Sequence, residues 1–119
     1  MNAIQNIVDW NISRNLTEFN PDNEIRLLSE ELAEFITAVN NDDEYEMVDA
    51  LADLIVVAIG GIYKLGYTPE KVLIEVHKEI SSRQGAINPL TGKWEKSPNQ
   101  DLRNRYTADY STCRSNLNI

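Results

Sequence analysis

The sequence predicts an all-α domain of four main helices, packed as a bundle that assembles into an oligomer. Three observations support this prediction. Apolar residues recur with a helical period over the first two thirds of the 119 residues, Asn, Asp, Gly and Pro fall at the expected helix ends, and one helix is apolar on nearly every side. With 42% hydrophobic residues, a chain of this length can bury one modest core, so we expect a single domain.

Breaks in the periodic pattern mark the ends of the expected helices. Asn20-Pro21 interrupts the chain before the second helix, because the residue before a proline disfavours helical geometry. The NNDD run at residues 40–43 offers caps for the third helix, and Gly66 is typical of the position after a helix end. Thr68-Pro69 suits the N-cap and first position of the fourth helix. We therefore expect helices at residues 2–15, 22–39, 43–65 and 69–83.

The third expected helix combines an apolar surface with carboxylates. A helix that is apolar all round must be covered, and the other helices of one chain are too few, so we expect a homodimer or homotetramer. Glu46, Asp49 and Asp53 nevertheless share one arc of roughly 60° on this helix. Gly60 continues that arc, where its missing side chain would leave room for a ligand.

Carboxylates also lie beside the apolar face of the second expected helix. Glu31 and Glu34 point along the edge of that face, whereas Glu30 projects further toward solvent. No basic residue lies between Arg26 and Lys64, so ion pairs within these two helices cannot neutralise the acids, whereas a divalent cation can. Oxygen ligands suit Mg²⁺ or Mn²⁺ and leave positions for substrate phosphates, which indicates phosphoryl chemistry. The alternative is a set of surface acids paired with bases of the fourth helix.

Composition excludes several other classes of protein. The net charge of −8 argues against general nucleic-acid binding, although bases outnumber acids after residue 75 and suit an anionic substrate. No apolar run reaches the length of a membrane span, and the N-terminus has no signal-peptide pattern, so we expect a cytoplasmic protein without a membrane partner. A single cysteine and a single histidine exclude a disulfide framework and a multi-thiolate zinc site.

The acidic segments also resemble a known signature. EELAE, followed by acids on the next helix, resembles the EExxE…ExxD motif of the all-α nucleoside triphosphate pyrophosphohydrolases, the MazG-like superfamily. The resemblance extends through VDALADLIVVAIGGIYKLGYTPEKVLIEVHKEISSRQG to GKWEKSPN, covers roughly residues 24–99, and is similar to small phage and bacterial members. It implies Mg²⁺-dependent cleavage of a nucleoside triphosphate between the α and β phosphates, in which a metal-associated water attacks phosphorus and releases pyrophosphate.

The resemblance assigns roles to the acids. Glu31 and Glu34 match the second and third acids of EExxE, which implies that they bind metal and take part in catalysis, and Glu30 is expected to help position the water. The second motif fits in two ways: Glu46 and Asp49 match ExxD literally, whereas Asp53, followed by LIVVAIG, occupies the place of the motif aspartate in many relatives. On the latter alignment Ala50 replaces the expected glutamate. The candidate metal ligands are therefore Glu31, Glu34, Glu46, Asp49 and Asp53.

Candidate substrate contacts lie mainly after the acidic helices. The family's fourth helix carries an EVHxSNMSK-like run that approaches substrate, and here the run is EVHKEISSR, with Ile80 in the asparagine position. Trp10 and Trp94 are candidates for stacking on a base, although an aromatic residue on an amphipathic element usually serves packing. The predicted substrate-binding residues are Lys78, Ser82, Arg83, Lys93, Lys96 and Trp10, and the alternative for each base is an exposed surface charge.

We expect residues 1–97 to form the helical catalytic domain with a basic loop, and residues 98–119 to form a polar C-terminal arm or tail. The loop assignment follows from the prolines and the Thr-Gly pair after Gly85, where helical periodicity ends. Two alternative functions remain open. One is phosphoribosyl-ATP pyrophosphohydrolase, which has the same chemistry, and the other is a non-catalytic regulator that binds metal or nucleotide.

Overall fold

Helices account for most of the chain. The computed structural model describes residues 2–98, 100 and 102–115, and its helices are α1 (Ala3–Ser13), α2 (Pro21–Asn40), α3 (Glu44–Lys64) and α4 (Pro69–Ser81). The all-α fold class with four main helices is therefore confirmed, and each helix end lies within two residues of its expected position.

Polar caps and turn residues define the helix ends, as the sequence indicates. Asn20 is the N-cap of α2, its side chain accepts a hydrogen bond from the Asn23 amide at 3.1 Å, and Pro21 occupies the first turn. The Asn20-Pro21 pair therefore begins α2 directly. Gly66 follows α3 with a φ of 92°, a backbone conformation that glycine adopts without steric cost.

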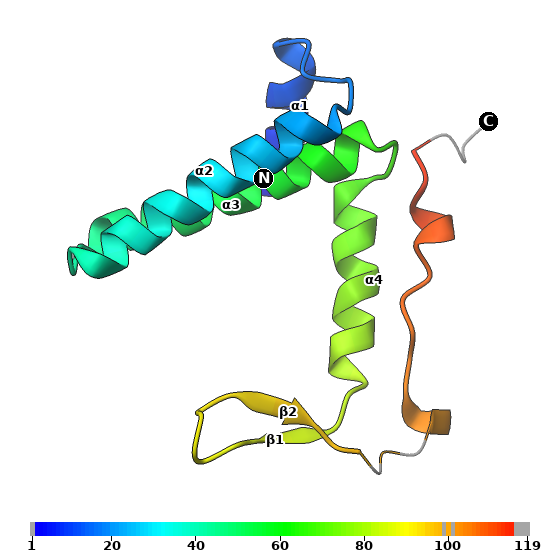
Figure 1. Cartoon of the computed structure of the whole chain (residues 1–119). Coiled ribbons are helices and arrows are strands. Elements are labelled where there is room, and N and C mark those ends of the chain that lie inside the picture. Colours follow the sequence, from blue (N-terminus) through cyan, green and yellow to red (C-terminus); the bar gives the residue numbers. More distant parts are fainter. Residues whose placement is uncertain (1, 99, 101, 116–119) are drawn as a thin grey trace.

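The helices α2 and α3 form a long antiparallel hairpin, which is the most extensive contact of the fold (Figure 1). Ala38 of α2 and Ala50 of α3 are both buried, and their small side chains let the two helices approach closely. Near the open end of the hairpin, Lys64 Nζ lies 2.5 Å from Glu24 Oε1, and both side chains are largely buried. The ion pair therefore joins α2 and α3 beside the last turn of α3.

Helix α1 packs against α3 and α4. Asn11 of α1 is buried, and its side-chain amide donates to the Ile7 carbonyl at 3.0 Å. A Cβ atom added to Gly60 would lie 3.1 Å from Asn11 Oδ1. The interpretation of Gly60 as space for a ligand is therefore wrong, because the missing side chain makes room for Asn11.

Helix α4 leads away from the α2–α3 hairpin to a short β-hairpin that the sequence did not indicate (Figure 1). Strand β1 (Gly85–Ile87) pairs antiparallel with β2 (Trp94–Lys96), and the turn between them includes Gly92 with a φ of 71°. Among the elements that the structure describes, the two strands contact only each other, and α2 contacts only α3. The acidic helices and the β-hairpin thus occupy separate parts of one chain.

Residues 102–115, which we call the C-terminal arm, run back along α4 (Figure 1). They include two 3₁₀ turns, η1 (Leu102–Asn104) and η2 (Tyr110–Cys113). The Tyr106 hydroxyl donates to the Glu75 carboxylate oxygens at 2.6 and 3.0 Å, and the Thr68 amide donates to the Cys113 carbonyl at 2.8 Å. The first contact raises the pKa of Tyr106 to about 12 and lowers the pKa of Glu75. The arm is therefore ordered against α4 at both ends of the helix.

One chain is too open to bury its own apolar residues. The radius of gyration is 17.3 Å, whereas a compact domain of this length has about 13.5 Å. The accessible surface is 8901 Å², whereas a compact 13.5 kDa monomer exposes about 6,500 Å². Seven large apolar side chains on α2 and α3 are 45–63% exposed: Ile25, Leu32, Ile36, Val39, Val48, Leu51 and Ile55.

The same helices are not of the kind that cross membranes. In the described part of the chain, no helix has both the length and the apolar character that a membrane span requires.

Removal of the Tyr106 hydroxyl tests how the C-terminal arm is held. We expect Tyr106→Phe to lower the melting temperature by a few degrees, because the carboxylate of the buried Glu75 loses its hydrogen-bond donor. Trypsin should then cut the arm faster than in the wild type. Tyr110→Phe is the matched control, since Tyr106 and Tyr110 are both 38% exposed. If the two variants melt and digest alike, the Tyr106–Glu75 contact does not hold the arm.

Candidate active site

Three carboxylates converge where α2 and α3 lie side by side. Glu31 and Glu34 are one helical turn apart on α2, and the antiparallel α3 brings Asp53 next to them. One carboxylate oxygen from each residue lies within 4.8 Å of the other two, and we call these three residues the acidic cluster. Within the described residues, this is the group of acids that could hold a metal ion.

The acidic cluster is electrostatically unfavourable without a cation. Oε2 of Glu31 is buried and has no hydrogen-bond partner. Desolvation by burial, a hydrogen bond with Glu34 and the charges of Glu34, Asp53 and Asp49 together raise the pKa of Glu31 from 4.5 to about 7. Two carboxyl groups can share such a hydrogen bond only when one of them holds a proton. A proton or a bound cation is therefore needed at neutral pH to offset the clustered charge.

The donor set of the cluster fits a hard divalent cation. All available ligand atoms are carboxylate oxygens, which suit Mg²⁺ or Mn²⁺ better than softer metals. The unpartnered Glu31 Oε2 offers a ligand atom that nothing else in the described structure satisfies.

Basic residues do not neutralise the cluster in the described structure. The ion pairs found there join Lys64 to Glu24, Lys78 to Glu75 and Arg83 to Glu79. The last two pairs lie within α4 or at its end, so Lys78 and Arg83 pair with acids of α4 itself rather than with the cluster. The alternative of surface acids paired with the fourth helix gains no support from these contacts.

The remaining predicted acids lie around the cluster. Asp49 is close enough for its charge to raise the pKa of Glu31, although it is outside the group of three. Glu46 and Glu34 instead line a cleft of about 420 Å³ further along the hairpin, near the loop that joins α2 to α3. Glu30 is exposed and outside the cluster. Of the two fits of the second motif, the geometry favours the one that uses Asp53.

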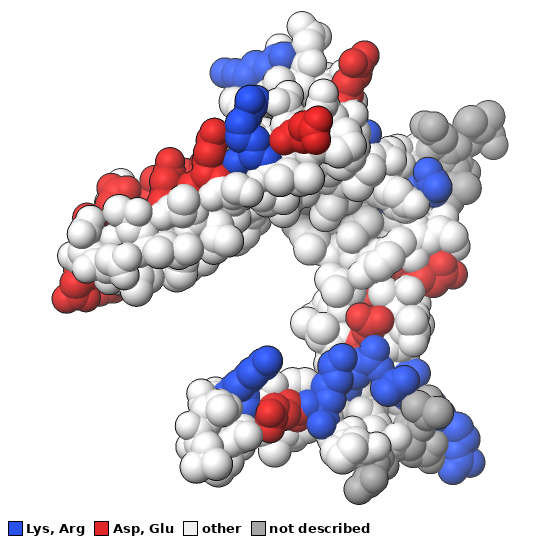
Figure 2. All heavy atoms as spheres, viewed as in Figure 1, with Lys and Arg blue, Asp and Glu red and all other residues white. Residues whose placement is uncertain are grey.

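Basic residues gather at the end of α4 that lies away from the α2–α3 hairpin, and they include bases predicted to bind phosphate (Figure 2). Arg83 and Lys96 line a cleft of about 480 Å³, which we call the corner cleft, between α4 and β2. The Arg83 side chain is only 13% exposed, and its Nη1 atom is buried without a hydrogen-bond partner. Arg83 is thus not an exposed surface charge, which was the alternative to its predicted role in substrate binding.

Other predicted substrate residues lie outside the corner cleft. The Ser82 hydroxyl donates to the Glu79 carbonyl at 2.8 Å and accepts from the Tyr106 amide at 2.8 Å, so it holds the C-terminal arm. Lys78 and Lys93 are exposed. Trp10 lies on α1, where the Arg14 guanidinium covers its ring at 4.8 Å from the centroid.

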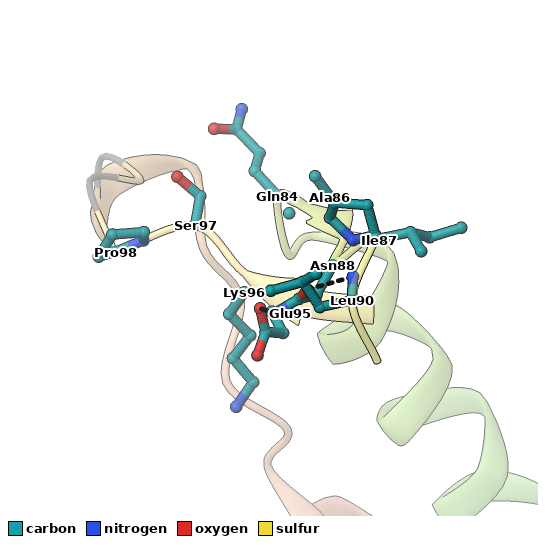
Figure 3. A pocket seen from close by; sticks show the side chains of 11 residues that line it. Gln84, Ala86, Ile87, Asn88, Leu90, Glu95, Lys96, Ser97 and Pro98 are labelled. Carbon is teal, nitrogen blue, oxygen red and sulfur yellow. Dashed lines mark hydrogen bonds between the residues drawn. The ribbon is translucent and has the colours of Figure 1, made fainter. Parts of the chain in front are cut away.

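The β-hairpin carries a further cavity of about 640 Å³, whose lining side chains are shown in Figure 3. Glu95 and Lys96 are its charged residues, and Glu95 accepts a hydrogen bond from the Asn88 side chain at 3.0 Å. Lys96 extends away from Ile87 and Leu90 (Figure 3). Among the described residues that line this cavity, Glu95 is the one carboxylate, and a group of three acids able to hold a metal ion is found only in the acidic cluster of the described chain.

The sequence indicates Trp94 as a candidate for base stacking, but it does not predict that Trp94 shares a cleft with Arg83 and Lys96, because the segment that carries it is expected to be an irregular loop. The hairpin is only three residues long on each side, too short for a strand period to be detected. The usable signal was Gly92, because a glycine in a short connection is compatible with a hairpin turn.

Comparison with known families finds one match. Residues 14–79 match the model of the family described as phosphoribosyl-ATP pyrophosphohydrolase, and this segment contains the acidic cluster and most of α4. Comparison with curated proteins and with solved structures gives no match.

The raised pKa of Glu31 predicts how the stability of the metal-free protein depends on pH. Between pH 4.5 and about 7, the folded protein binds more protons at Glu31 than the unfolded chain. The free energy of unfolding in EDTA should therefore fall as pH rises through this window, and Glu31→Gln should flatten the fall. Thermal melting across the window measures both, with Glu30→Gln as the control that keeps the wild-type slope. Parallel profiles for wild type and Glu31→Gln would mean that the carboxylates do not cluster.

Proposed function

The chain belongs to the phosphoribosyl-ATP pyrophosphohydrolase family, and from this premise we propose that it is a Mg²⁺-dependent nucleoside triphosphate pyrophosphohydrolase. The family is one of pyrophosphohydrolases, enzymes that act on phosphoric anhydrides, within the MazG-like superfamily. The single observation that carries the proposal is the acidic cluster, whose oxygens lie within 4.8 Å of one another on matched residues. The products would be a nucleoside monophosphate and pyrophosphate.

Glu31, Glu34 and Asp53 are the proposed metal ligands, with Asp49 as the nearest further carboxylate. When bound there, Mg²⁺ would neutralise charge on the phosphate oxygens and acidify the attacking water. The acids themselves would fix the site, because two come from one helix and one from its antiparallel neighbour. Glu30, exposed beside the cluster, is proposed to accept a hydrogen bond from the water and orient it.

Bases of the corner cleft are proposed to hold the outer phosphates. Arg83 and Lys96 both line the cleft, and the Nη1 atom of Arg83 has no hydrogen-bond partner among the described residues. Exposed Lys78 and Lys93 lie on α4 and on the hairpin turn, where they can add to the attraction for an anion.

The acidic cluster and the corner cleft would work together only if two chains combine. In one chain the strands do not contact α2 or α3, so the two charged groups lie apart (Figure 1). The chain also exposes roughly 2,400 Å² more than a compact monomer of its mass, an area that a large subunit interface could bury. We therefore propose a homo-oligomer, a dimer or tetramer, in which the acids of one chain face the corner cleft of another.

Phosphoribosyl-ATP is the second candidate substrate, because the description of the matched family names it. Both substrates would be cut between the α and β phosphates, so the same acids would serve either one. An assay with both compounds separates the two candidates.

Neutral substitutions in the acidic cluster test the proposed chemistry. We expect the wild type to release pyrophosphate from a nucleoside triphosphate with Mg²⁺, and Glu31→Gln or Asp53→Asn to reduce kcat by about 10³-fold or more, since each loses a metal ligand. Glu30→Gln and Glu46→Gln should be milder, because both residues are outside the cluster. Nucleotide binding without turnover in the wild type would support the regulator instead.

Mixing of inactive variants tests whether the active site is shared. Asp53→Asn lacks a cluster acid and Lys96→Ala lacks a base of the corner cleft, so each should be inactive or weak alone. After unfolding together and refolding, random mixed dimers should regain about a quarter of wild-type activity, because half of the dimers then contain one intact site. The control is the same mixture without refolding. No gain from exchanged subunits would place both groups of residues in one chain's own site.

A further inference from the structure

The corner cleft combines aromatic, apolar and cationic groups in one cavity. Trp94 is 46% exposed and Ile80 is 60% exposed, so both present apolar surface. Arg83 and Lys96 supply positive charge on the same walls, and Glu79 offsets part of it through its contact with Arg83 at 3.5 Å. A volume of about 480 Å³ lies in the range of small-molecule sites.

The Trp94 indole is fixed in place by the β-hairpin. Residues Gly85 and Trp94 lie on neighbouring strands, and a Cβ atom added to Gly85 would lie 2.5 Å from Trp94 Cζ2. The edge of the ring therefore rests over glycine backbone, where no larger residue would fit. An indole held in this way, with nearly half its surface open, can receive a flat ligand without first being ordered.

The chemistry of the cleft is that of a nucleotide, a flat aromatic ring joined to an anion. An aromatic base gains by stacking on an indole face, and phosphate oxygens gain from the unpartnered Nη1 of Arg83 and from Lys96. Trp10, the tryptophan that the sequence favoured for this task, already has the Arg14 guanidinium over its ring.

We propose that Trp94 stacks on the base of the nucleotide substrate in the corner cleft, and that purine nucleotides are the preferred class. Purines have two fused rings and cover more of an indole than pyrimidines do. Ile80, which replaces a polar residue of the related motif, provides apolar surface beside the base, while Arg83 and Lys96 orient the phosphates. This inference deepens the proposed function, since it names the residue that binds the base of the same substrate.

Two single-tryptophan variants test the stacking directly. Trp10→Phe leaves Trp94 as the sole tryptophan, and Trp94→Phe leaves Trp10. Each full-length protein is titrated with an α,β-methylene purine triphosphate in Mg²⁺, which binds without being cut. We expect fluorescence quenching in Trp10→Phe, weaker quenching with the pyrimidine analogue, and none in Trp94→Phe. Quenching only in Trp94→Phe would overturn the proposal in favour of Trp10.

Affinity measurements separate stacking from phosphate binding. Trp94→Ala should weaken binding of the purine analogue roughly tenfold, as expected for loss of one stacked base, and leave inorganic tripolyphosphate binding unchanged. Ile87→Ala is the matched control, because Ile87 pairs with Trp94 across the hairpin and is 66% exposed but lines the other cavity. If Trp94→Ala weakens binding of the purine analogue and of tripolyphosphate equally, Trp94 has a structural role. The same conclusion follows if Trp94→Ala and Ile87→Ala lose equal affinity for the purine analogue.

The outcomes also distinguish this inference from the proposed function. Pyrophosphate release with no quenching of either tryptophan would support the proposed hydrolase activity and contradict the stacking role of Trp94. Quenching of Trp94 without pyrophosphate release would keep the nucleotide site and reject the hydrolase.

Discussion

Mutual repulsion of carboxylates between α2 and α3 is the constraint on which the rest of the structure depends. Small residues such as Ala38 and Ala50 let the helices approach closely, and that approach forces Glu31, Glu34 and Asp53 together. The charges of Glu34 and Asp53 destabilise the ionised form of Glu31, so a bound cation would stabilise the hairpin. The same close packing that builds the fold therefore creates the repulsion that a bound cation would relieve.

In the open single chain, the acidic, uncharged and basic surfaces lie on different parts of the molecule. Acids line one edge of the α2–α3 hairpin, and an uncharged face lies beside them (Figure 2). The bases of the corner cleft, Arg83 and Lys96, lie at the far end of α4, and the described strands do not contact α2 or α3. An arrangement of this kind would place substrate between chains, so assembly and catalysis would depend on the same contacts.

Periodicity and capping residues were enough to predict the four helices and the helix faces that carry the acids, because both follow from local spacing. The choice between Asp53 and Glu46 needed the structure, since it depends on the register of two antiparallel helices, which sequence spacing leaves open. The role of Gly60 could not be predicted because its neighbour, Asn11, is distant in sequence. The burial of Arg83 likewise depends on tertiary contacts, and the short β-hairpin has too few residues to show a period.

The turn between α3 and α4 determines the direction of α4, and therefore the position of the β-hairpin that follows α4. Helix α4 is about 20 Å long, so a rotation of about 3° at Gly66 would move its far end by about 1 Å. A displacement of that size can cost an enzyme about a hundredfold in rate. The turn is correspondingly braced: the Ser115 amide donates to the Gly66 carbonyl at 2.9 Å, and the Arg114 guanidinium lies 4.6 Å from the Tyr67 ring centroid. Arg114 and Ser115, which are far from this turn in sequence, therefore help to fix the orientation of α4 relative to α3.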